Sequence, residues 1–152
     1  LQAIDDEKLH ADILKLASGA SVSFDSYTYN KSLMKSQVVL VEPREWLVVE
    51  GLFALSYPNI VVCTDVKAFI HASPDIRLAR RKHRDMTIRG YTPEEVDYQW
   101  QHHVRPADKA HIEPHKETCH VVIENDDDWR PGLGRLIEHM EAFDASSPKP
   151  QP

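Results

Sequence analysis

Basic side chains gather in one short segment of an otherwise acidic chain. The segment contains Arg77, Arg80, Arg81, Lys82, Arg84 and Arg89. The spacing of Arg77, Arg81 and Arg84 places them along one side of a helix. Arginine binds phosphate well because its planar guanidinium donates two parallel hydrogen bonds. The cluster therefore predicts an anionic partner. The alternative is a solvated basic face that pairs with nearby carboxylates, namely Asp85, Glu94 and Glu95.

An acidic residue follows an apolar run farther upstream. Residues 46–49 are Trp-Leu-Val-Val, and Glu50 and Gly51 come directly after them. In open α/β sheets, ligands bind beyond the carboxyl ends of the strands. A carboxylate at such a point can hold Mg²⁺ on nucleotide phosphates. A solvated glutamate at a strand end fits the pattern equally well.

Two tyrosines alternate in a polar segment, at Tyr27 and Tyr29. An aromatic ring offers a face for stacking, and tyrosine adds a hydroxyl that can donate a hydrogen bond. The pair could therefore form a pocket for a flat ring. The other interpretation is that both rings close over the hydrophobic core.

These residues need a scaffold, and the pattern of apolar residues predicts one. Apolar β-branched runs predict strands over residues 37–41, 46–49, 66–70 and 121–123. Helical spacing predicts helices over residues 6–18, 73–88, 92 to just before Pro106, and 133–143. Ser73-Pro74 and a capping box at Thr92 and Glu95 mark two helix starts. Alternating strands and helices predict an α/β fold with a mostly parallel sheet flanked by helices.

Composition narrows the class of protein. The chain has 152 residues, which suits one domain, expected over residues 1–144 with a disordered tail at 145–152. A net charge of -6 argues against nucleic-acid binding and against a membrane surface as partner. Two cysteines predict reduced thiols in a cytoplasmic protein.

Histidines cluster near the end of the predicted helix at 92. They are His102, His103, His111 and His115, with Cys119 and His120 following. Zinc sites use such ligands. Pro106 and Pro114 interrupt the helix that would align them, and we favour titratable surface histidines.

The ordered set of motifs resembles the uridine kinase family. The matching segments include Tyr27-Thr28-Tyr29, Val48-Val49-Glu50-Gly51, Ser73-Pro74-Asp75, Arg84-Asp85, Arg89-Gly90 and Val104-Arg105-Pro106. The resemblance runs over residues 3–125. It implies a P-loop-kinase-like fold and transfer of the γ-phosphoryl group of ATP to the 5′-hydroxyl of a pyrimidine nucleoside.

The resemblance also implies roles for single residues on the nucleoside side. Asp5 matches an aspartate that holds the ribose hydroxyls, and Tyr27 and Tyr29 match aromatic residues around the base. Arg81 matches an arginine on the nucleoside, and Gln99 matches a glutamine near the base.

On the phosphate side, Glu50 matches an acid in the Mg²⁺ shell. Arg84 and Arg89 match lid arginines that neutralise the transferring phosphoryl group, and we take them as the catalytic candidates. Phosphoryl transfer depends mainly on positioning and charge stabilisation, which these residue types can supply.

The 152 residues depart from the family pattern in two ways. None of the five glycines precedes a lysine, so the N-terminal P-loop unit, G-x-x-x-x-G-K-[ST], is missing, as is the general-base aspartate. This chain by itself is therefore expected to be inactive, and the activity to belong to a longer parent. Ser32 and Tyr91 stand where the family has His and Arg, which predicts weaker discrimination between bases.

Two alternatives stay open. One is a phosphoribulokinase-like or other small-molecule kinase of the same superfamily. The other is a non-catalytic module that binds a nucleoside or serves in assembly. Self-association into a homo-oligomer is also left open by the sequence.

Overall fold

The computed structural model describes residues 5–26 and 37–146. The chain divides into two compact units, Leu1–Cys63 and Thr64–Pro152. No helix in the described part of the chain is long and apolar enough to cross a membrane.

The first unit begins with helix α1, Asp6–Ala17. The Asp5 carboxylate caps it by accepting a hydrogen bond of 2.9 Å from the backbone N–H of Lys8. At the other end, Gly19 has a φ of +87°, and the N–H groups of Gly19 and Ala20 donate to the carbonyls of Leu16 and Lys15. This is the left-handed cap that glycine adopts at low cost, so the predicted helix and its end are confirmed.

Strands β1, Val22–Asp25, and β2, Val38–Val41, follow α1. They pair antiparallel, with Val22 opposite Val41. A short 3₁₀ turn, Ala54–Ser56, leads into α2, Pro58–Val62. The small core of this unit consists of Ile13, Tyr57 and Ile60, with Leu9, Val49, Phe53 and Cys63 packed around it.

The strand predicted at residues 46–49 is wrong. Residues 46–50 form no regular element. Val49 packs against the core, whereas Val48 is 78% exposed. An apolar β-branched run becomes a strand when a neighbouring strand accepts its backbone hydrogen bonds. Among the described residues, the sheets contain β1 paired with β2 and β3 paired with β4, and neither includes this run.

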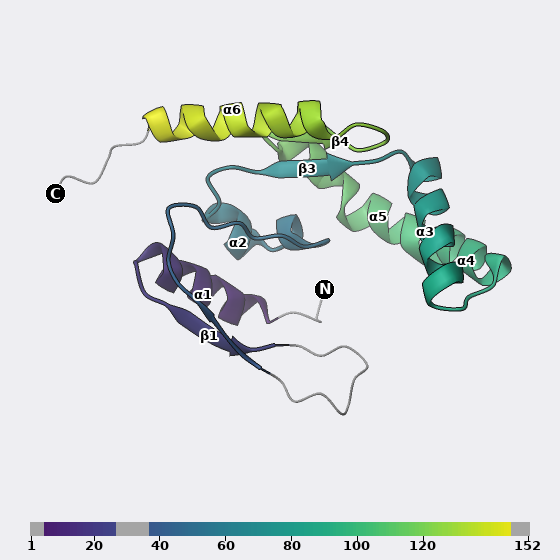
Figure 1. Ribbon diagram of the computed structural model, residues 1–152, viewed down its shortest axis with the longest axis horizontal. Helices are drawn as coiled ribbons and strands as arrows, with labels where there is room; N and C mark the ends of the chain where they lie inside the picture. The colour runs from purple at the N-terminus through teal and green to yellow at the C-terminus, as the bar shows by residue number, and fades with distance from the viewer. Residues whose placement is uncertain (1–4, 27–36, 147–152) are drawn as a thin grey trace. The chain divides into compact units, whose positions relative to one another are not determined.

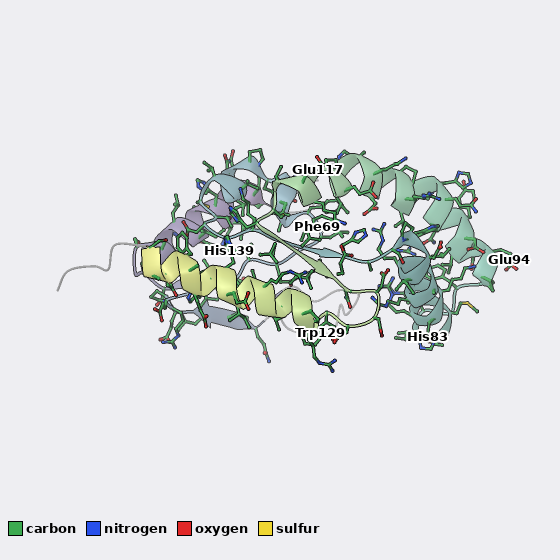
Figure 2. All side chains as sticks on the ribbon, turned by 90° about the horizontal axis from the view of Figure 1, so that it is seen from above. Phe69, His83, Glu94, Glu117, Trp129 and His139 are labelled. Atoms are coloured by element: carbon green, nitrogen blue, oxygen red, sulfur yellow. The ribbon has the colours of Figure 1, made fainter. Side chains whose placement is uncertain are left out.

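The second unit contains the parallel pair that the sequence predicts. Strand β3, Ala68–His71, lies beside β4, Val121–Glu124, with Ala68 opposite Val121 and His71 opposite Glu124. Helix α6, Arg130–Ser146, packs along β4. Figure 1 shows α6 running over the two strands, and Figure 2 labels His139 on it. The α/β class with parallel strands and flanking helices is confirmed, although β1 and β2 form a separate antiparallel pair.

The connection from β3 to β4 is helical. It contains α3, Pro74–Ile88, α4, Pro93–Gln99, α5, Arg105–His111, and a 3₁₀ segment, Glu113–Thr118. The predicted capping box is present: the Glu95 N–H donates to the Thr92 hydroxyl at 3.3 Å and the Thr92 N–H donates to the Glu95 carboxylate at 2.8 Å. Helices α3 and α4 contact each other.

The helix predicted to end before Pro106 instead continues through it. Between α4 and α5 lies a π-helical turn, Trp100–Val104. The Arg105 N–H donates to the Trp100 carbonyl, five residues back. Pro106 then falls in the first turn of α5, a position where proline is well tolerated.

The last helix extends farther than predicted. The sequence places the start of the tail at residue 145, but α6 ends at Ser146. Residues 147–152 lie outside the described residues.

One glycine of α6 allows the helix to approach β4 closely. A Cβ added at Gly132 would lie 2.8 Å from Cγ2 and 2.9 Å from Cα of Ile123. Both distances are shorter than side-chain carbon contacts normally allow, and the second is to backbone that cannot rotate away. At Gly134, two residues farther along, a Cβ would meet nothing within 4 Å.

We therefore expect Gly132→Ala to destabilise the fold and Gly134→Ala to spare it. Overpacking against Ile123 should lower the free energy of unfolding by about 1–3 kcal/mol. The control, Gly134→Ala, places a better helix former in open space and should raise the free energy of unfolding by up to ~1 kcal/mol. Urea unfolding of both variants measures the difference. Equal stabilities would contradict the close packing at Gly132.

Candidate functional site

A buried carboxylate near the end of α3 collects three of the predicted arginines. The Asp85 side chain is 1% exposed. Its Oδ1 accepts a hydrogen bond of 2.7 Å from Arg84 Nε and lies 3.2 Å from Arg89 Nη1. Its Oδ2 lies 3.3 Å from Arg81 Nε. We call these four residues the Asp85 cluster.

Helix geometry explains why the cluster forms. Arg81 and Arg89 stand four residues before and after Asp85, so both fall on its side of the helix. The same residue also ends the helix, because its carbonyl accepts the N–H groups of Arg89 and Tyr91, each at 3.2 Å. Gly90 lies between these two donors with a φ of +72°, a conformation that suits glycine.

The charges of the cluster are unequal, since three guanidinium groups surround one carboxylate. The hydrogen bond from Arg84, together with the charges of Arg84, Arg81 and Arg89, holds the pKa of Asp85 below its ordinary value, although burial acts against this. The same hydrogen bond raises the pKa of Arg84. The carboxylate therefore stays ionised, and the cluster carries an excess of positive charge.

A second pair of predicted residues lies next to the cluster. The Arg81 Nη2 donates to the Gln99 side-chain oxygen at 2.9 Å, so α3 and α4 bring together two candidates for nucleoside binding. Both line an open groove with Glu94, Glu95, Tyr98, His103 and Val104. Figure 2 labels His83 on α3 and Glu94 on α4, the two helices that carry this groove.

Two groove residues, Tyr98 and His103, are not among the site residues that the sequence predicts. Tyr98 is 59% exposed, and its ring centroid lies 4.5 Å from that of His102 and 5.8 Å from that of His103. The available signal is the spacing of Gln99 and His103, which are four residues apart and so share one side of a helix. Planar side chains beside Arg81 and Gln99 could stack against a flat ring.

The other basic residues of α3 hold the scaffold together. Arg77 makes two hydrogen bonds with Asp108 of α5, at 2.7 and 2.8 Å, and lies 5.7 Å from the centre of the Trp100 ring. The hydrogen bond to Asp108 raises the pKa of Arg77. Arg80 donates to the carbonyls of Asn125 and Asp126. The basic residues of α3 thus fall into two groups. Arg77 and Arg80 bind other parts of the fold, whereas Arg84 of the Asp85 cluster keeps N–H groups that Asp85 does not engage.

The remaining predicted site residues belong to the first unit or lie outside the described residues. Asp5 is exposed and caps α1. Glu50 is exposed, in the irregular segment after Val49. Tyr27 and Tyr29 lie outside the described residues, so the proposed ring pocket stays a prediction.

A Mg²⁺ site of several protein ligands is not found in the described part of the chain, where no three His, Cys, Asp or Glu side chains come close enough to hold a metal ion. Magnesium on nucleotide phosphates commonly uses one or two carboxylates, with water and phosphate oxygens completing its shell. The exposed carboxylate of Glu50 fits this kind of single ligand.

The lowered pKa of Asp85 predicts a loss of stability in acid. Because its pKa in the folded chain lies below the ordinary 3.8, the unfolded chain takes up the proton more readily. The stabilising contribution is complete above pH 3.8 and disappears as the pH falls through the lower, folded value. Urea unfolding between about pH 2 and 7 measures this.

Asp85→Asn should show a smaller acid-induced loss of unfolding free energy than the unmodified chain, because an amide does not titrate. The control is Asp127→Asn, which changes an exposed carboxyl outside the cluster. It should lose unfolding free energy in acid as the unmodified chain does, because Asp85 is unchanged. Parallel pH curves for the unmodified chain and Asp85→Asn would contradict the prediction.

The amino-acid sequence was compared with protein families and with known proteins, and both comparisons lead to the same family. The Phosphoribulokinase / Uridine kinase family matches residues 1–128. A uridine kinase of Macrococcus caseolyticus is 34% identical over 121 residues, which is 80% of this chain and 59% of that protein. Uridine kinases of Halalkalibacterium halodurans and Alkaliphilus metalliredigens are each 30% identical over 141 residues, covering 93% of this chain and 67% and 68% of those proteins.

The chain thus spans about three fifths to two thirds of the length of these relatives. The match includes every residue of the Asp85 cluster as well as Gln99, since all lie within residues 1–128. This chain belongs to the phosphoribulokinase/uridine kinase family.

Proposed function

We propose that the protein carrying this chain is a nucleoside kinase that transfers the γ-phosphoryl group of ATP to the 5′-hydroxyl of a uridine-like nucleoside. The observation that carries the proposal is the convergence of Arg81, Arg84 and Arg89 on Asp85, with Arg81 also bonded to Gln99. Positive charge and planar polar groups thus lie side by side. We take the nucleoside to be uridine-like because the relatives are named uridine kinases.

The two halves of this arrangement suit different parts of the reaction. Arg84 and Arg89 are 47% and 51% exposed, so they can reach the oxygens of a phosphoryl group, on which negative charge is spread during transfer. Arg81 and Gln99 line the groove and offer hydrogen bonds to a nucleoside. Asp5, Tyr27 and Tyr29 remain candidates for the ribose and the base.

ATP would supply the phosphoryl group, and Mg²⁺ would neutralise charge on its phosphates. The guanidinium donors of Arg84 and Arg89 suit phosphate oxygens, and Glu50 offers an exposed oxygen ligand. A cytoplasmic location is part of the same proposal, supported by two cysteines that are free thiols, Cys63 and Cys119.

The family also includes phosphoribulokinases by its description. A phosphorylated sugar alcohol would need arginines on both ends of the substrate. The groove that contains Arg81 and Gln99 also has Tyr98 and His103 along it, and flat rings favour a nucleoside over a second phosphate. A panel of nucleosides and ribulose 5-phosphate as substrates therefore tests the choice between them.

The arginines should divide their effects between rate and substrate affinity. In the protein that carries this chain, Arg84→Ala or Arg89→Ala should lower kcat by about 10²–10³-fold with little change in nucleoside KM, because their charge acts mainly in the transition state. Arg81→Ala should mainly raise nucleoside KM. Steady-state kinetics with uridine and ATP measure both constants.

The control is Arg105→Ala, which removes an exposed arginine of α5 that lies outside the cluster. It should leave kcat and KM near their original values. If all three cluster variants fail in nucleoside affinity alone, the division of roles is wrong.

Glu50→Gln should lower activity and alter the dependence on Mg²⁺. An amide oxygen is a weaker ligand than a carboxylate, and we expect a loss of about 10- to 100-fold at limiting Mg²⁺ that higher Mg²⁺ partly restores. Glu45→Gln is the matched control, since Glu45 is exposed in the same irregular segment. Titrating Mg²⁺ at fixed ATP distinguishes them, and identical curves for both variants would remove Glu50 from the site.

A further inference from the structure

The contacts of Asp85 leave much of each arginine available. Arg84 uses Nε and Arg89 uses Nη1 to contact the carboxylate. The described residues place no second acid against either guanidinium. Since about half of each side chain is exposed, the remaining N–H groups are open to a ligand.

The carboxylate itself is shielded. With 1% of its side chain exposed, Asp85 cannot contact a ligand that approaches from solvent. An ionised carboxylate accepts hydrogen bonds and donates none, so it can hold three cations at once without offering a donor of its own. Arginine side chains are long and lose much conformational freedom when they are fixed in one place. In the structure, Asp85 contacts Arg84 through a hydrogen bond and Arg81 and Arg89 through ion pairs.

We propose that Asp85 is a positioning residue, which holds Arg84 and Arg89 in the arrangement that binds a phosphate chain and holds Arg81 beside them at the groove. This inference deepens the proposed function and rests on it. Asp85 does not touch substrate in this scheme. It acts through the guanidinium groups, and its carboxylate remains in place when the phosphate chain binds on the exposed side.

Two possible effects of Asp85 have opposite signs, which makes the inference testable. If the residue acts merely as a nearby negative charge, its removal should strengthen the binding of a polyanion, because the positive excess grows. If it positions the arginines, its removal should weaken binding even though the positive charge increases, because each freed side chain must be ordered again.

The experiment measures binding of inorganic tripolyphosphate to the 152-residue chain by isothermal titration calorimetry, at fixed salt and without Mg²⁺. Asp85→Asn keeps the size of the side chain and one acceptor oxygen but removes the charge. We expect binding to be roughly 5- to 100-fold weaker than for the unmodified chain.

Asp97→Asn is the matched control. Asp97 of α4 pairs with Lys82 of α3 at 2.7 Å, so this change also removes one negative charge near the basic helix but frees no arginine of the cluster. Its binding should be equal or tighter. A tighter or unchanged dissociation constant for Asp85→Asn would overturn the positioning role and leave the proposed function intact. No binding by the unmodified chain at millimolar tripolyphosphate would overturn the positioning role as well, because the arginines would then form no phosphate site of their own; the proposed function of the longer protein is tested separately by its kinetics.

A second measurement covers the case in which Asp85→Asn does not fold. In ¹⁵N-labelled unmodified chain, the Nε–H signal of Arg84 should exchange slowly with solvent and show restricted motion before ligand is added, whereas that of the exposed Arg105 should not. Equal mobility of the two signals would show that the cluster is not ordered in advance and would overturn the inference.

Discussion

A buried carboxylate imposes the strongest constraint on the second unit. An ionised group taken out of water is costly unless charged partners and hydrogen bonds surround it. Asp85 is 1% exposed, and its partners come from its own helix and from the residue that ends that helix. The helix must therefore continue regularly from residue 81 to residue 89, so that Arg81 and Arg89 both fall on the side of Asp85. The site and the end of α3 thus depend on a single interaction.

The same principle operates once more along α3. Asp108 is 6% exposed and receives two hydrogen bonds from Arg77, while the Trp100 ring lies beside that guanidinium. The ion pair joins α3 to α5 across the π-helical turn. The apolar side chains of Val96 and Trp100 are also buried, with 1% and 7% of their surface exposed, so the helical connection combines buried apolar residues with two buried acids. Removal of either acid would leave an arginine without its partner, which makes the arrangement specific for these helices.

Local signals in the sequence predicted local structure well. The start of α3, the capping box of α4 and the glycine at the end of α1 depend on residues within a few positions of one another, and all three are confirmed. The parallel pair of β3 and β4 was also predicted correctly, but two other predictions failed. Residues 46–49 have the composition of a strand but no partner strand in the described residues. Pro106 is a helix breaker by type, yet it lies in the first turn of α5, directly after the π-helical turn, and the helix continues through it. The close contact of Gly132 with Ile123 likewise depends on tertiary packing, which spacing does not encode.

In the candidate site, the sequence predicted the basic residues but could not tell which of them are available to a ligand. The spacing of basic residues indicated an anionic partner, but Arg77 and Arg81 look alike in sequence and differ in structure, because one is matched by Asp108 and the other shares its acid with two more arginines. What distinguishes a structural arginine from one available to a ligand is the ratio of acids to guanidinium groups around it. Arg77 has a carboxylate largely to itself, with both terminal nitrogens engaged. Arg84 and Arg89 share one carboxylate and engage one nitrogen each. An anion approaching the second pair need not break the ion pairs that hold the helix, so the buried acid can stay paired with its cations while the same arginines bind phosphate.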